Sequence, residues 1–197
     1  MRTVAALFVD PRGCYANRPG VEVWDKLRDA RKYAGPHPVV AHPPCSRWSR
    51  LAGLVEKVHG YRAGEDGGCF ASALASVRSW GGVLEHPESS SAWRKFGLSI
   101  PPRGGGWVRA DDVGGWTCCV RQGRYGHRAK KSTWLYAHGM DLPSMRWGWV
   151  GKTSALVSYA DCDKDPRPRL SKRAAEATPV EFRDLLLSIA RTARRES

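Results

Sequence analysis

Short apolar runs separated by polar, turn-forming segments make up most of this chain. Four runs have the length and flanking turn residues of buried strands: residues 3–9, 21–24, 38–41 and 83–85. Between the last two runs, an apolar stripe at the i, i+3, i+4 and i+7 spacing predicts a helix: Phe70, Ala73, Leu74 and Val77. Asp66 is its expected N-cap, and Gly81 and Gly82 end it. This order of strand, loop, helix and strand predicts a parallel α/β unit.

The remaining segments carry local signals of their own. We expect a short charged helix at 25–33, a loop at 54–65, an irregular glycine-rich stretch at 101–115 and a strand at 132–137. Thr178 is the expected N-cap of a last helix, with Pro179 in its first position and Glu181 three residues after the cap. The apolar face of that helix is formed by Phe182, Leu185, Leu186 and Ile189.

These elements together predict an α/β fold, with a small Rossmann-like, mostly parallel sheet flanked by helices. The chain has 197 residues and shows no long shift in composition, so we expect a single domain that spans residues 1–197.

Charge indicates the kind of partner. Lysine and arginine number 32 against 19 aspartates and glutamates, which gives a formal net charge of +13. An excess of this size favours a polyanion, with nucleic acid, and DNA in particular, ahead of an acidic membrane surface. Tryptophan and arginine are adjacent at Arg47-Trp48, Trp93-Arg94 and Arg146-Trp147, and such side chains can stack on bases. The alternative is that these tryptophans lie in the core and the arginines are solvated.

The cysteines and the hydropathy pattern indicate a location. Six cysteines form neither a CxxC pair nor a regular framework, which favours a reducing, cytoplasmic setting. No apolar run approaches the roughly 20 residues of a membrane span, and the first run reaches Asp10 too early for a signal peptide. No metal site is expected, since His42, Cys45, Cys118 and His127 match no ligand spacing.

A cysteine and a carboxylate follow two successive predicted strands. Cys45 comes after the run at 38–41, behind two prolines that fix the backbone and ahead of a polar, basic segment. Glu85 ends the run at 83–85. A rigid strand end that holds a thiolate, followed by a loop that closes over a substrate, is a common way to present a nucleophile. The alternatives are a packed thiol and an ion-paired structural acid.

Three segments in this order resemble the C5-cytosine DNA methyltransferase family. Residues 43–53 (PPCSRWSRLAG) are similar to its catalytic segment, and residues 83–87 (VLEHP) to its Glu-Asn-Val or Glu-Asn-Pro segment, with His86 where Asn is usual. Residues 125–135 (YGHRAKKSTWL) resemble its Tyr-Gly and Gln-x-Arg-x-Arg segments, whose first Arg falls on Lys131. The resemblance covers roughly residues 38–137.

The resemblance implies a covalent mechanism on a base that has left the duplex. The Cys45 thiolate would add to C6 of cytosine while Glu85 stabilises a proton on N3, and C5 then takes a methyl group. Lys130 and Lys131 would steady the flipped nucleotide, and residues 46–65 would close behind it. We therefore expect Cys45, Glu85 and Lys131 to be catalytic.

The resemblance also implies S-adenosylmethionine as cofactor and a nucleic-acid surface. The expected cofactor-binding residues are Phe8, Asp10, Gly13, Asp25 and Pro43. The expected nucleic-acid contacts are Arg47, Ser49, Arg50, Arg124 and Lys130. Gly13 is the one glycine that matches the family's Phe-x-Gly-x-Gly loop. A separate target-recognition domain has no room, which leaves that role to residues 137–168 or to a partner subunit.

Two other functions remain open from the sequence. One is a non-catalytic, basic nucleic-acid-binding module on a degenerate methyltransferase scaffold. The other is a Cys-dependent enzyme that modifies pyrimidines, including free nucleotides, with another one-carbon donor. Residues 151–153 (GKT) resemble the end of a phosphate loop, but Arg146 occupies the position of the required first glycine.

Overall fold

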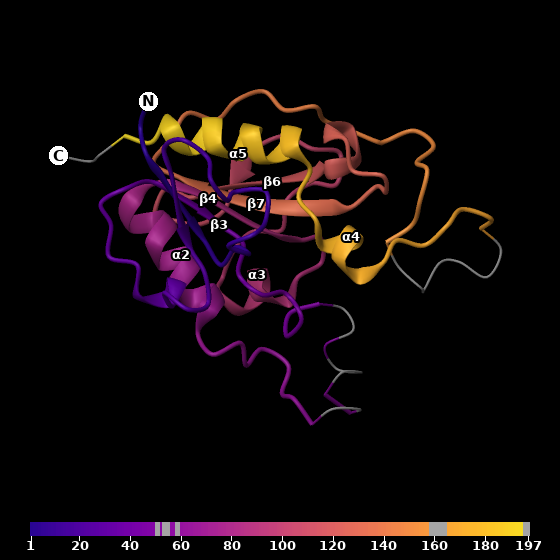
Figure 1. Ribbon diagram of the computed structural model, residues 1–197, viewed down its shortest axis with the longest axis horizontal. Coiled ribbons are helices and arrows are strands. Elements are labelled where there is room, and N and C mark those ends of the chain that lie inside the picture. The colour runs from indigo at the N-terminus through magenta and orange to yellow at the C-terminus, as the bar shows by residue number, and fades with distance from the viewer. Residues whose placement is uncertain (50–51, 53–55, 58–59, 158–164, 195–197) are drawn as a thin grey trace.

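The computed structural model contains one mixed seven-stranded sheet and describes residues 1–49, 52, 56–57, 60–157 and 165–194 (Figure 1). The strands are β1 (Val4–Leu7), β2 (Val21–Trp24), β3 (Val39–Ala41), β4 (Gly82–Pro87), β5 (Val108–Arg109), β6 (Trp116–Arg121) and β7 (Ser132–His138). Their spatial order is β2-β1-β3-β4-β7-β6-β5. The α/β expectation is therefore confirmed.

The parallel arrangement holds for half of the sheet. β2, β1, β3 and β4 pair in parallel, as the first part of the sequence predicts. β7 pairs antiparallel with both β4 and β6, and β5 pairs antiparallel with β6. Residues 122–131, which include the 3-10 helix η2 (Gln122–Tyr125), join β6 to β7, and this link is too short for a crossover to a parallel neighbour.

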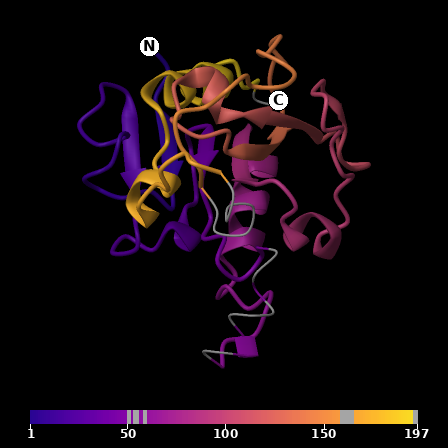
Figure 2. The same ribbon diagram turned by 90° about the vertical axis from the view of Figure 1, so that its right-hand side faces the viewer.

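One long helix covers each face of the sheet (Figures 1 and 2). Helix α2 (Cys69–Trp80) buries Phe70 on the face that also receives Leu7 and Val39. Helix α5 (Val180–Arg191) buries Phe182 on the opposite face. Successive residues of β1, β3 and β4 alternate between the two cores, so these central strands are apolar on both sides. The short helices are α3 (Ser91–Lys95), α4 (Lys172–Glu176) and the 3-10 helix η1 (Ala30–Lys32).

The helix expected at 25–33 shrinks to η1, because side chains compete there for backbone donors. The Asp25 carboxylate accepts the Arg28 N–H, and the Asp29 carboxylate accepts the Arg31 N–H. Asp29 also lies in the left-handed region at φ 53°, which interrupts a helix. Each of these aspartates closes a turn of its own, and a regular helix does not form.

The helix ends differ slightly from expectation. The N-cap of α2 is Gly68 and not Asp66, although the Asp66 carboxylate accepts the Gly68 and Phe70 N–H groups at the start of the helix. Helix α5 begins one residue later than expected, with Pro179 and not Thr178 at its N-cap. Part of the expected loop at 54–65 lies outside the described residues, and Glu56 and Lys57 within it are helical.

The remaining expectations concern single strands and the membrane. Strand β6 follows the glycine-rich stretch and was not expected, while β7 confirms the strand at 132–137. Within the described ranges, no helix has the length and apolar character needed to cross a bilayer.

Candidate active site

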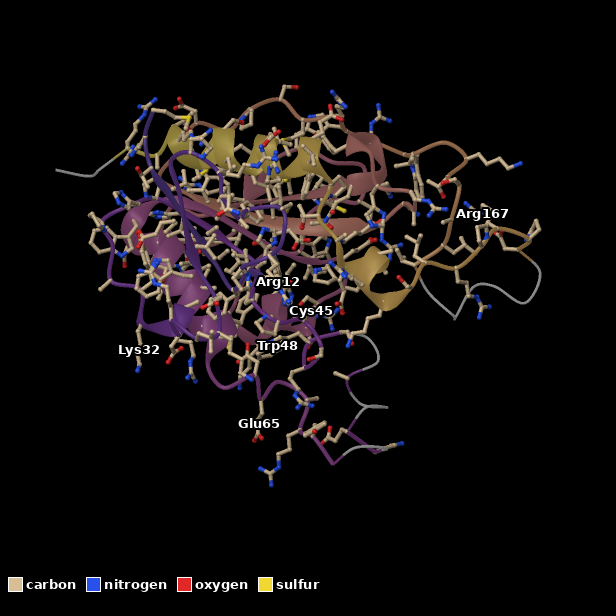
Figure 3. All side chains as sticks on the ribbon, in the orientation of Figure 1. Arg12, Lys32, Cys45, Trp48, Glu65 and Arg167 are labelled. Atoms are coloured by element: carbon tan, nitrogen blue, oxygen red, sulfur yellow. The ribbon has the colours of Figure 1, made fainter. Side chains whose placement is uncertain are left out.

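A large pocket lies where the strand order reverses. From β1 the chain runs outward to β2 and then returns to the other side of β1 as β3, and ligands of such sheets bind at the carboxyl ends beside this reversal. The pocket here has a volume of about 1280 Å³. Its walls are formed by residues 8–10 and 12–15 after β1, by residues 42–46 after β3 and by residues 85–87 within β4. Residues 131–133, Val157 and residues 172–173 and 175–178 complete them. Figure 3 shows Arg12 and Cys45 close together at this edge.

Cys45 is held just beyond the end of β3. The His42 N–H still donates to the Leu7 carbonyl oxygen, but Pro43 and Pro44 have no donors and end the ladder. The Trp48 N–H donates to the Cys45 carbonyl oxygen and turns the chain away from the sheet. The backbone thus fixes Cys45 on the pocket wall, as the sequence predicts.

The pocket controls the charge of the Cys45 thiol. Burial, with the nearby carboxylates of Glu85 and Glu176, raises the pKa of Cys45, while the Lys131 ammonium group lowers it. The free site therefore favours the thiol, and Lys131 is the cation that favours the thiolate.

Glu85 occupies the middle of β4 and faces the same pocket. Its carboxylate accepts from three donors: His42 Nδ1 at 3.0 Å, Gln122 Nε2 at 3.1 Å and Thr133 Oγ1 at 3.2 Å. Burial raises the pKa of Glu85, but the hydrogen bond and charge of His42, together with Lys131, outweigh burial and bring it to about 2. Glu85 is thus ionised in the free site at neutral pH.

Lys131 connects the pocket to the C-terminal segment. Its Nζ donates to the carbonyl oxygens of Glu176 (2.9 Å) and Ala177 (2.8 Å), between α4 and α5. Burial lowers the pKa of Lys131, and the charges of Glu85, Cys45 and Glu176 oppose that effect. Cys45, Glu85 and Lys131, which are expected to be catalytic, therefore meet at one site.

Two further side chains join Glu85 in a hydrogen-bonded row that sequence reasoning missed. The Tyr15 hydroxyl lies 2.8 Å from His42 Nε2, and His42 Nδ1 contacts Glu85. Tyr15 is buried, and its Cys14 neighbour is held by a 2.8 Å bond from Arg183 Nη1 to the Cys14 carbonyl oxygen. The position of His42 directly before Pro-Pro-Cys was a usable signal. Nothing in the sequence marks Tyr15.

His86 lies on the opposite face of β4 from Glu85. Its ring packs against Phe70 and Trp93, and its Nδ1 lies 2.7 Å from Ser90 Oγ. Burial lowers the pKa of His86 to about 4, against the opposing effects of Glu85 and the Pro44 carbonyl. His86 is therefore neutral and supports the Pro-Pro segment from behind.

Most residues expected to bind a cofactor line this pocket. Phe8, Asp10, Gly13 and Pro43 all do so. Asp25 does not, because its carboxylate is used in the turn after β2, where it accepts the Arg28 N–H at 2.9 Å. Arg12 also lines the pocket, and the sequence analysis did not single it out.

The residues expected to bind nucleic acid fall into two groups. Arg47 packs its guanidinium 3.8 Å from the Tyr61 ring centre, on the turn that follows Cys45 and contains Ser49. Arg50 lies outside the described residues. The second group surrounds Trp149, whose surface is 65% exposed.

Trp149 is flanked by cations beside a second pocket of about 840 Å³. The Lys130 ammonium lies 4.4 Å from the Trp149 ring centre, and Arg124 Nη1 donates to the Trp149 carbonyl oxygen at 2.8 Å. Arg167, labelled in Figure 3 far from Cys45, pairs with Asp165 on the same pocket. Val157 lines both pockets, so they adjoin.

Within the part of the chain that the structure describes, no three His, Cys, Asp or Glu side chains are grouped to hold a metal ion. No model of a known protein family matches the chain, and no curated protein is detectably similar to it. The site must therefore be interpreted from its own chemistry.

Proposed function

We propose that this protein is a DNA base-modifying enzyme that transfers a methyl group from S-adenosylmethionine to C5 of cytosine through a Cys45 adduct. The supporting observation is that Cys45, Glu85 and Lys131, from three distant parts of the sequence, line one pocket at the strand-order reversal. We further propose that the sheet is a reduced Rossmann-like scaffold, because its four parallel strands place the pocket at the position such folds use.

The chain's own residues account for activation of the base. Cys45 Sγ bonds to C6 as the C5–C6 double bond opens, and a proton on N3, held by Glu85, takes up the charge. C5 is then nucleophilic. After C5 is methylated it loses its proton to water, the C5–C6 double bond re-forms and the S–C6 bond breaks. Lys131 favours the thiolate at the first step and stabilises its negative charge again when the S–C6 bond breaks at the last.

The pocket has room for both reactants. Its volume of about 1280 Å³ exceeds the roughly 300–1,000 Å³ of single small-molecule pockets. S-adenosylmethionine, when bound, supplies an electrophilic methyl group. Phe8 and Pro43 offer apolar walls for it, Asp10 offers an acceptor, and the Arg12 guanidinium suits a carboxylate. These residues fit the cofactor, with Asp25 excluded.

The pocket mouth also suits a flipped nucleotide. Lys172 and Arg173 line it beside Lys131, and these side chains provide cations for the flanking phosphates. The base must leave the duplex, and no separate recognition domain is evident among the described residues. Recognition of the target sequence by a partner subunit therefore remains part of the proposal.

Covalent trapping tests this function. The protein is incubated with DNA that contains 5-fluorocytosine, with and without S-adenosylmethionine, and denaturation-resistant adducts are measured by intact mass. We expect a cofactor-dependent adduct that Cys45→Ala abolishes. Cys69→Ala is the matched control, since Cys69 is a half-buried thiol at the start of α2, outside the pocket. If neither variant loses the adduct, Cys45 is not the nucleophile.

Two other candidates give different results in the same assay. Trp149 and its cations favour a non-catalytic nucleic-acid-binding module, which would bind DNA in a salt-sensitive way but form no adduct and ignore Cys45→Ala. The sparse cofactor loop, in which Gly13 alone matches, favours a pyrimidine-modifying enzyme with another one-carbon donor. That enzyme would form a Cys45 adduct without S-adenosylmethionine, on DNA or on free nucleotides.

A further inference from the structure

The proposed reaction needs a proton at Glu85 that the free carboxylate does not hold. Three donors surround Glu85, and its pKa of about 2 leaves it ionised at neutral pH. Neutral cytosine presents N3 as an acceptor, which an ionised carboxylate cannot bind. A second group must therefore hold the proton and release it toward Glu85 when the base arrives.

The two oxygens of Glu85 are not equivalent. Oε1 accepts from both Gln122 Nε2 and Thr133 Oγ1, so both of its lone pairs are engaged. Among the described residues, Oε2 has one donor, His42 Nδ1 at 3.0 Å. The second lone pair of Oε2 is therefore available to a ligand. A ring nitrogen in the pocket would form its hydrogen bond with this oxygen.

His42 is bonded so that it can gain or lose a proton without losing a partner. An ionised carboxylate only accepts, which puts a hydrogen on His42 Nδ1 in either charge state. The second ring nitrogen faces the Tyr15 hydroxyl at 2.8 Å. That hydroxyl donates to Nε2 of a neutral imidazole and accepts from Nε2–H of an imidazolium. Both side chains of the His42–Glu85 pair are largely buried, at 13% and 12% exposure, so water competes little for these bonds.

We propose that Tyr15, His42 and Glu85 form a proton relay, in which His42 holds the proton that Glu85 passes through Oε2 to N3 of the flipped cytosine. The relay deepens the proposed function and rests on it. When the thiolate adds to C6, the imidazolium of His42 gives its Nδ1 proton to Oε2, and that same proton then lies between Oε2 and N3. When the S–C6 bond breaks, that proton returns along the same path, and no proton is gained or lost by the relay.

Other charged groups face the relay from the neighbouring elements. Lys131, Cys45 and His86 act on Glu85, and Lys131 favours its ionised form. Burial is the main reason that the pKa of Tyr15 lies well above its usual value. The charges of Cys14 and Asp184 raise this pKa further, and the charge of Arg183 lowers it. His42 contacts the base only through Glu85, so it is a positioning residue and not a catalytic one.

The test compares two histidines at opposite ends of one strand. His42→Asn keeps a donor for Glu85 but cannot carry the proton, whereas His37→Asn changes the histidine before β3, outside the pocket. The readout is the rate of Cys45 adduct formation on 5-fluorocytosine DNA across pH. We expect the wild-type rate to rise and then fall with pH, which gives the profile two limbs. His42→Asn should slow adduct formation by about 10²–10⁴-fold and remove one of these limbs. His37→Asn keeps both limbs. An unchanged rate, or a slower rate with both limbs retained, overturns the relay.

A second measurement does not depend on the reaction. Nitrogen NMR of the histidine rings reports which ring nitrogen of His42 carries hydrogen. The relay requires hydrogen on Nδ1 in the wild type and a change of that pattern in Glu85→Gln and in Tyr15→Phe. If the wild type forms no adduct, the proposed function fails, and this measurement then decides only whether the hydrogen bonds of Tyr15, His42 and Glu85 are those that the relay requires. Hydrogen confined to Nε2 overturns them.

Discussion

Acid should weaken the fold through Glu85 in a way that one substitution can isolate. The folded protein lowers the pKa of Glu85 from 4.5 to about 2, although burial alone would raise it. A carboxyl whose pKa is depressed by folding adds stability that is complete above its unfolded value. That stability is lost as the pH falls from 4.5 toward 2 and Glu85 takes up a proton. The drop corresponds to about 3 kcal/mol of unfolding free energy.

The assay is urea unfolding of the wild type and of Glu85→Gln, followed by tryptophan fluorescence at a series of pH values. Gln is nearly isosteric but has no charge, so its stability does not respond to this titration. Other carboxyls with lowered pKa values, such as Asp29, Asp111 and Asp165, titrate alike in both proteins and cancel in the difference. We expect the wild type to exceed the variant by about 3 kcal/mol at pH 7.

That advantage should shrink below pH 4.5 and approach zero near pH 2, where Glu85 is half protonated or more. A difference between wild type and Glu85→Gln that stays constant from pH 7 to pH 3 would refute the reasoning. It would mean that Glu85 is not held in its ionised form by His42, Gln122 and Thr133.

Three further substitutions test other parts of the molecule. Lys131→Met removes the charge that lowers the pKa of Cys45, so alkylation of Cys45 by iodoacetamide should require a higher pH. Lys130→Met should leave the pH dependence of alkylation unchanged. Equal shifts in the two variants would contradict the role given to Lys131. Trp149→Ala should weaken single-stranded DNA binding by about 1–3 kcal/mol if a base stacks on the exposed ring, whereas Ile100→Ala at another exposed site should not. Phe70→Ala should lower the free energy of unfolding in denaturant by about 3–5 kcal/mol, because the ring is fully buried against Trp48, Trp93 and Phe96. A loss below about 1 kcal/mol would contradict that packing.

Much of the scaffold follows from local pattern. The runs that become β1, β3 and β4 are apolar on both faces, which is typical of central parallel strands, and the stripe that begins at Phe70 has the period of α2. The antiparallel half was not predictable in this way. Whether β7 pairs with β4 depends on the length of the link after β6 and on the unpaired edge of β4, and both are properties of the assembled sheet.

The residues of the candidate site likewise divide into those that local sequence pattern predicts and those that depend on strand pairing. Cys45 and Glu85 could be found because Cys45 follows one recognisable apolar run and Glu85 ends the next, so the sheet brings them to one pocket. Gln122 and Thr133 could not, since they reach Glu85 only through the pairing of β7 with β4. Asp25 does not line the pocket, because a short-range turn uses its carboxylate, a competition that spacing alone does not reveal.

The free site holds its protons in the wrong places for the proposed reaction. Burial and carboxylates keep hydrogen on Cys45, while His42 and its neighbours keep Glu85 ionised. The reaction needs the reverse, a thiolate and a proton beside the carboxylate. In the proposed relay the proton for N3 comes from His42, and the bound base shifts the balance because its N3 is the acceptor that the resting site lacks. A resting thiol also resists oxidation and alkylation, since the thiolate is the reactive form. Burial and the charge of Glu85 therefore protect Cys45 in the absence of substrate, while the hydrogen bonds of His42 hold the proton that the proposed attack requires.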